Sequence, residues 1–182
     1  MAERRRGKAR ATEIEFFKPG SGNRYRSVLH RHDGLLIELD GGGYNQVDTG
    51  SLPHDLAHFV VEDALGLEQG LWGVIAAGGM FAHTKVIAGR RPPHAAKRAQ
   101  AVVDAAGDRL SQAEVLTRAV CDVAKAGADN DFDRLRRAAG QRYWSSDVTP
   151  EAVKTACRRL RETSATWQNL APGEPLRVYW RA

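Results

Sequence analysis

The sequence predicts an α+β fold, in which an antiparallel sheet of N-terminal hairpin strands plus a C-terminal strand packs against several helices. Short strand-like runs separated by turn residues occupy positions 13–40, helix-capping signals recur between 51 and 167, and an alternating pattern follows residue 173. At 182 residues the chain is long enough to bury a core without disulfides or metal. We therefore expect a single α+β domain over residues 12–182.

The N-terminal strands are predicted from the turns between them. Residues 13–17 have the composition of a first strand, and the turn-forming sequence PGSGN closes it. Residues 25–31 and 35–40 flank Asp33-Gly34, a pair that supplies the positive φ angle of a tight hairpin. Three antiparallel strands are expected here.

The rest of the chain is predicted to be mainly helical. Ser51 or Leu52 should begin the first helix, and Gly66 should end it. Residues 71–88 are apolar and are expected to be buried, although periodicity does not separate helix from strand there. Every second residue from 176 to 180 is apolar, which is the period of a half-buried strand. The remaining helices are expected over residues 92–106, 111–126, 131–139 and 150–167.

Positive charge is concentrated at the N-terminus. The formal net charge is +5 at pH 7, and the first ten residues contribute +4 of it, from five cations and Glu3. Residues 1–11 are therefore predicted to form a flexible basic tail ahead of a nearly neutral body. Nucleic acid is a candidate partner through this tail alone, because phosphate contacts require clustered cations.

Other features of the whole chain indicate an intracellular protein. The longest apolar stretch, residues 71–82, falls well short of the roughly twenty residues of a membrane helix. No apolar segment typical of a signal peptide follows the N-terminal cations. Cys121 and Cys157 lie in predicted helices without the spacing of a zinc site, so structural thiols are expected. We expect a cytoplasmic location and no membrane contact.

One short motif could carry chemistry, His54-Asp55-x-x-His58 on the first predicted helix. Side chains four residues apart rise from the same face of a helix and can bind one metal ion. The motif resembles the H-E-x-x-H motif of zincin metalloproteases, which implies zinc bound by His54 and His58 with Asp55 in the place of the general base. The Asp55 carboxylate is one methylene shorter than the Glu of that family.

A catalytic zinc ion normally takes a third protein ligand and keeps one position for water. His83 is the preferred third ligand, and Glu68 is the other option. Glu62 lies about 12 Å from His54 along the helix axis, too far to share one ion with it. We therefore expect Glu62 to support the site from outside the metal ligands or to lie on the surface.

The doublet His54-Asp55 also resembles that of HD-domain phosphohydrolases. That resemblance implies an earlier ligand histidine on a helix and a late ligand aspartate, for instance Asp104. The upstream histidines, His30 and His32, fall instead in a predicted strand and hairpin turn. We rank this family below the zincin-like interpretation.

Two hypotheses of different classes follow. The first is a zinc-dependent hydrolase that uses His54, His58 and His83 as metal ligands and Asp55 as the catalytic group. The second is a non-enzymatic binding or regulatory module, in which the sheet or the basic tail makes the contacts. They differ in whether the protein binds metal.

Overall fold

The computed structural model describes residues 11–20, 24–41 and 52–181. All but one residue of the predicted basic tail therefore lies outside the described residues, and so does Ser51. Within the described ranges the chain forms five strands and six helices, which confirms the predicted α+β class.

The five strands form one antiparallel sheet in the order β4-β3-β2-β1-β5. The hairpin turn predicted at Asp33-Gly34 is present, with a φ of 81° at Gly34 and a hydrogen bond from Leu35 N–H to Asp33 Oδ1 of 3.2 Å. The C-terminal strand joins the sheet, as expected, and its neighbour there is β1. The strands are β1 (Thr12–Phe17), β2 (Arg26–His30), β3 (Leu36–Asp40), β4 (Thr84–Ala88) and β5 (Pro175–Trp180).

Strand β4 is not predicted from the sequence as a separate element. The apolar segment 71–88 divides into helix α2 (Leu71–Ala76) and β4, with a turn at Gly78 (φ 110°) between them. β4 lies at the edge of the sheet beside β3, and Ile87 is 42% exposed. The expectation that 71–88 is buried throughout is therefore wrong for β4, because an edge strand has a neighbour on one side only. It is also wrong for Ala77, Ala82 and His83, which are exposed in the connection between α2 and β4.

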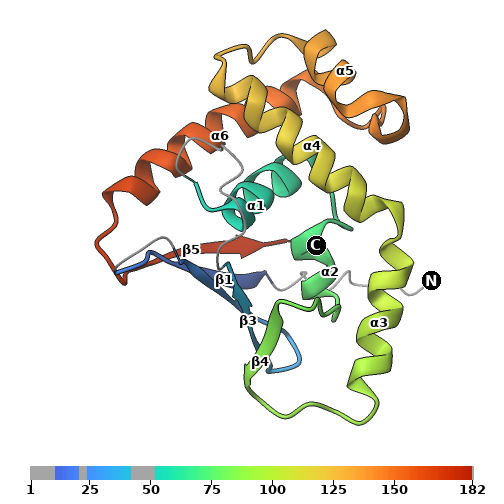
Figure 1. Ribbon diagram of the computed structural model, residues 1–182, viewed down its shortest axis with the longest axis vertical. Coiled ribbons are helices and arrows are strands. Elements are labelled where there is room, and N and C mark those ends of the chain that lie inside the picture. The colour runs from blue at the N-terminus through green and yellow to red at the C-terminus, as the bar shows by residue number, and fades with distance from the viewer. Residues whose placement is uncertain (1–10, 21–23, 42–51, 182) are drawn as a thin grey trace, which may run out of the picture.

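Helices α1, α4, α5 and α6 lie in layers on one side of the sheet, and α3 runs apart from them beside α2 (Figure 1). Helix α1 lies between the sheet and the pair formed by α4 and α6, and α5 packs on α4. None of the helices in the described part of the chain is long and apolar enough to cross a bilayer. Their bounds are α1 (His54–Leu65), α3 (Ala95–Ala106), α4 (Asp108–Lys125), α5 (Phe132–Tyr143) and α6 (Pro150–Asn169).

The ends of the helices show which local sequence signals predict a helix boundary correctly. Gly66 ends α1 in the left-handed conformation, and Thr149 caps α6 by accepting a hydrogen bond from Ala152 N–H, both as predicted. Helix α1 begins at His54, two residues later than Leu52. Helix α4 begins at Asp108, ahead of the predicted capping box at 111–114, because the chain turns at Gly107 directly from α3 into α4.

Helix α1 is buried on nearly every side. Nine of its twelve residues are buried, including His58, which is 3% exposed, and Glu62, which is 0% exposed. Trp72 of α2 donates from Nε1 to the carbonyl oxygen of Asp55 at 2.7 Å and holds the first turn of α1. Polar side chains inside a protein need polar partners, and the partners of His58 and Glu62 define the candidate site.

Candidate metal centre

The two histidines of the motif lie on the same face of α1, as their spacing predicts. Their ring centroids are 4.5 Å apart, with the planes tilted by 59°. Helix α4 crosses α1 at this point and brings Glu114 to both rings. One carboxylate from a distant segment of the chain thus joins the pair.

Glu114 contacts the Nε2 atom of each histidine with a different oxygen. His54 Nε2 lies 3.4 Å from Oε1, and His58 Nε2 lies 2.9 Å from Oε2. One ligand atom from each of the three residues lies within 4.8 Å of the others. Within the described ranges this is the one group of three or more histidine, cysteine or acidic side chains with such spacing.

The opposite nitrogen of each ring also faces a carboxylate. His58 Nδ1 lies 2.9 Å from Glu62 Oε1, and His54 Nδ1 lies 3.4 Å from Asp55 Oδ1. Histidines that bind metal commonly have such an outer carboxylate, which fixes the tautomer and increases the basicity of the ligand. Both rings are therefore oriented with Nε2 toward Glu114.

Glu62 is held in place by α2. The N–H groups of Leu71 and Trp72, in the first turn of α2, donate to its two oxygens at 2.8 and 3.1 Å. Gly70 precedes them, and a Cβ there would lie 2.3 Å from Glu62 Cδ. The chain can bring these N–H groups to the buried carboxylate because residue 70 has no side chain.

The contacts shift the pKa of each member of the cluster. Burial lowers the pKa of His58, but the hydrogen bonds and charges of Glu114 and Glu62 outweigh it and raise the pKa to about 10. The contact with Asp55, and next the contact with Glu114, raises the pKa of His54. The two histidines hold the pKa of Glu114 well below its usual range. At neutral pH the metal-free cluster therefore carries a proton on His58 Nε2, which a metal ion would replace.

The cluster forms part of the wall of a cavity of about 550 Å³, which is in the range of small-molecule sites. Beside it, the hydroxyl oxygen of Tyr25 accepts a hydrogen bond from Asp55 N–H at 3.4 Å. Burial, and next the charge of Asp55, raises the pKa of Tyr25 above its usual range, so the hydroxyl keeps its proton. The described residues of the wall are Tyr25, Asp40, Gly41, His54, Asp55, His58, Leu71, Phe81, His83, Leu110 and Glu114.

The predicted site residues are found in or near this cavity, with one difference in the ligand set. His54 and His58 belong to the cluster, and Asp55 contacts His54. His83 lines the same cavity but is not a member of the cluster. Glu68 is exposed and lines two other pockets, and Glu62 contacts the outer nitrogen of His58.

The residues that the HD-domain resemblance requires have other partners. His30 Nε2 lies 3.1 Å from Glu15 Oε2, and His32 Nε2 lies 2.9 Å from Thr12 Oγ1. Asp104 accepts a hydrogen bond from Gln100. The structure thus does not bring these residues to His54.

Glu114 is the residue that the sequence analysis missed. In the sequence, Ser111-Gln112-Ala113-Glu114 has the form of a helix-capping box. That role explains the presence of Glu114 without any functional site. A second signal is present, because Leu110, Glu114, Thr117 and Cys121 share one helical face, and Thr117 and Cys121 are buried. Glu114 itself is about half exposed, so it lies at the edge of the buried face of α4, where its carboxylate can contact a buried partner.

Comparisons of the chain with protein-family models, with curated proteins and with solved structures find no significant match. The functional interpretation therefore depends on the residues and contacts described above.

Proposed function

We propose that this protein binds one divalent metal ion, most suitably zinc, through His54, His58 and Glu114, and hydrolyses a small molecule bound in the adjoining cavity. One observation carries the proposal. Nε2 of each histidine faces Glu114, while Nδ1 of each contacts a second carboxylate. Metal ligation through Nε2 requires this arrangement, in which both Nε2 atoms face one shared carboxylate and an outer carboxylate holds each Nδ1.

The separations within the cluster support the proposal. With zinc–ligand distances of 2.0–2.1 Å, tetrahedral geometry puts two donor atoms about 3.3 Å apart. The two histidine contacts of Glu114, at 3.4 Å to Oε1 and 2.9 Å to Oε2, are near that value, and one ligand atom from each of the three residues lies within 4.8 Å of the others. Small movements of the Glu114 side chain, which is about half exposed, would suffice to complete the ligand set.

The types of ligand also favour zinc in a catalytic rather than a structural site. Two imidazole nitrogens and one carboxylate oxygen form a ligand set found in catalytic zinc sites, where a fourth position is left for water. A bound divalent ion lowers the pKa of such a water molecule and polarises a substrate carbonyl. His54, His58 and Glu114 all line the cavity, so that position would face the space a substrate occupies.

We assign Asp55 the role of proton acceptor. Asp55 lines the cavity next to His54, and its contact with His54 Nδ1 is longer than the contact of Glu62 with His58. In hydrolysis the oxygen of water adds to the substrate carbonyl carbon and its proton passes to Asp55. The bond to the leaving group then breaks, and the leaving group takes that proton.

Elemental analysis of the purified protein, dialysed against zinc and then against buffer, tests metal binding. The parent chain should retain roughly one zinc ion per molecule. His54→Ala and His58→Ala should lose it, and His83→Ala should keep it. Loss of zinc in His83→Ala, with retention in Glu114→Gln, would instead make His83 the third ligand.

Absence of metal from the parent, together with a melting temperature that zinc does not raise, would overturn the proposal. The cluster would then be a buried network of ion pairs. The interpretation as a non-enzymatic binding module would remain.

A further inference from the structure

The cavity wall beyond the cluster is largely apolar. Leu71, Phe81 and Leu110 line it together with the ring of Tyr25. These residues come from α2, from the connection between α2 and β4, from the start of α4, and from the segment before β2. Four separate segments of the chain thus contribute apolar groups to one cavity.

This apolar surface begins next to the candidate metal ligands. Leu110 and Glu114 are four residues apart on α4, so their side chains share a face, and both line the cavity. Phe81 and His83 add a flat surface, since their rings stack with centroids 5.8 Å apart and planes within 7°. A planar group bound at the metal would pack against Leu110 and against the stacked rings of Phe81 and His83.

Away from the histidines and the metal ion that they would hold, the charged side chains of the wall are acidic. The described wall residues include the carboxylates of Asp40, Asp55 and Glu114 but no lysine or arginine. A phosphate or carboxylate group needs cationic or N–H partners when it is buried, and the part of the wall beyond the metal ligands offers it no lysine or arginine among the described residues.

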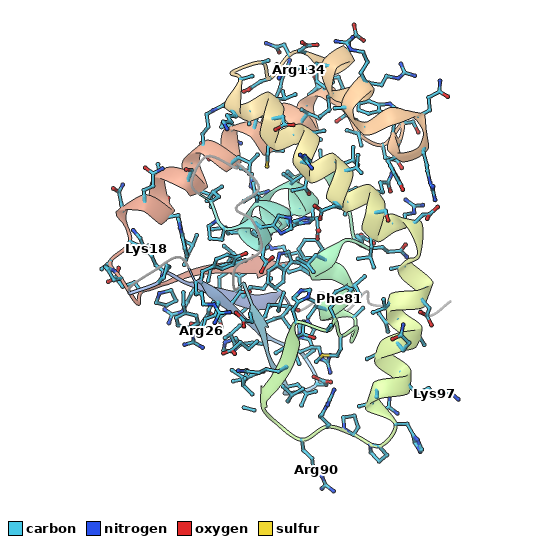
Figure 2. The ribbon with its side chains drawn as sticks, in the orientation of Figure 1. Lys18, Arg26, Phe81, Arg90, Lys97 and Arg134 are labelled. Carbon is cyan, nitrogen blue, oxygen red and sulfur yellow. The ribbon has the colours of Figure 1, made fainter. Side chains whose placement is uncertain are left out.

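The exposed cations of the β4–α3 segment lie elsewhere. Arg90 and Lys97 are found at the outer end of β4 and α3, whereas Phe81 lies beside α2 (Figure 2). Phosphate binding by Arg90 or Lys97 would therefore occur away from the candidate metal centre. The residues of the cavity wall, and not Arg90 or Lys97, therefore determine which substrate charge the cavity can accommodate.

On the basis of the proposed function, we infer that the substrate is an uncharged ester or amide that carries a flat apolar group of about the size of an aryl ring. The carbonyl lies at the metal, and the apolar group packs between Leu110 and the stacked rings of Phe81 and His83. Hydrolysis adds water across the bond between the carbonyl carbon and the ester oxygen or amide nitrogen, and yields a carboxylic acid and an alcohol or amine.

Hydroxamic acids test this inference without requiring activity, because the hydroxamate group binds zinc directly. The probes are acetohydroxamate, benzohydroxamate and 4-carboxybenzohydroxamate, titrated calorimetrically into the zinc-loaded protein. Benzohydroxamate should bind at least tenfold more tightly than acetohydroxamate, since its ring buries roughly 100 Å² of apolar surface. The added carboxylate should weaken binding at least fivefold.

Two variants locate the preference. Leu110→Gln should bring the affinities for benzohydroxamate and acetohydroxamate to within about threefold of each other while zinc content is unchanged. The matched control is Val102→Gln, because Val102 lines a separate groove beside α2 and α3. That variant should retain the preference of the parent chain.

Equal affinities for benzohydroxamate and acetohydroxamate in the parent, or tighter binding of the carboxylated probe, would overturn the inference about the substrate. The zinc content, measured first, separates this result from failure of the proposed function. A parent chain that binds zinc but shows no ring preference loses only the inference. A parent chain that binds no zinc loses both.

Discussion

His58 and Glu62, one turn apart on α1, form a buried pair in which His58 Nδ1 lies 2.9 Å from Glu62 Oε1. Glu62 also accepts hydrogen bonds from Leu71 N–H and Trp72 N–H, so one carboxylate connects a candidate metal ligand to the start of α2. Because Glu62 is wholly buried, loss of its charge would leave these donors with a weaker partner and no access to water. Metal affinity and the docking of α2 should therefore depend on the same side chain.

Replacement of Glu62 tests this connection. Glu62→Gln should weaken zinc binding 10- to 100-fold, because His58 loses the anion that orients its ring. The same change should lower the free energy of unfolding by about 3 kcal/mol. Zinc titration and urea denaturation measure the two effects. Glu68→Gln, at an exposed glutamate outside the cavity, should change neither.

Replacement of Glu114 tests the third ligand. Glu114→Gln keeps the size of the side chain but removes the anion, so stoichiometric zinc should be lost or its affinity should fall by at least a hundredfold. Asp122→Asn is the matched control, because Asp122 is an exposed acid on the same helix. If Glu114→Gln binds zinc as the parent does, Glu114 is not a metal ligand.

The need for glycine at position 70 can be tested by adding one methyl group. In Gly70→Ala the Cβ would lie 2.3 Å from Glu62 Cδ, so either the carboxylate or α2 must shift. We expect a loss of about 2 kcal/mol in unfolding free energy and weaker zinc binding. Gly20→Ala, where a Cβ meets no atom within 4 Å, should leave both unchanged. Circular dichroism during thermal unfolding and zinc titration are the measurements.

The stability of the metal-free protein should fall as pH rises above neutrality. The pKa of His58 is raised from an ordinary 6.5 to about 10, so its stabilising contribution is complete below pH 6.5 and is lost as pH rises toward 10. The limiting slope for one proton is about 1.4 kcal/mol per pH unit. Urea denaturation in chelator between pH 6.5 and 8.5 should show this decline.

Two comparisons identify the group responsible for that slope. The decline should be smaller in His58→Gln. It should disappear in the zinc-loaded parent, where the metal has replaced the proton. A decline of equal size in His58→Gln would assign it to another group. The pKa of Glu114 is depressed, so its contribution is present above pH 4.5 and is lost as pH falls, outside this window.

The role of Asp55 can be separated from metal binding. Asp55→Asn should weaken zinc binding, as Glu62→Gln does, because His54 loses its outer carboxylate. At zinc concentrations that saturate the variant, hydrolysis of 4-nitrophenyl esters should still fall by at least a hundredfold, since the amide cannot accept a proton. Stopped-flow or steady-state absorbance assays, with zinc content measured in parallel, are suitable. Asp122→Asn again provides the control. Full activity in Asp55→Asn would leave Asp55 with an orienting role toward His54.

The parts of the fold that the sequence predicts depend on signals a few residues long. The Asp33-Gly34 turn, the Thr149 cap and the Gly66 terminus each act on their immediate neighbours, and each is present in the structure. Such signals do not predict helix α2 and strand β4. Both lie in one continuous apolar run, in which periodicity does not separate helix from strand. Which part of that run becomes a sheet edge depends on pairing with β3.

The candidate site likewise has one part that the sequence predicts and another that depends on the tertiary structure. The i, i+4 spacing of His54 and His58 is a property of the helix, so the sequence by itself determined that the two rings share a face. Only the tertiary structure decided that Glu114, 56 residues beyond His58, meets both Nε2 atoms, and that Glu62 is buried against α2. The physical reason is that helical periodicity acts over a few turns, whereas the crossing of α4 over α1 is set by packing of the whole core.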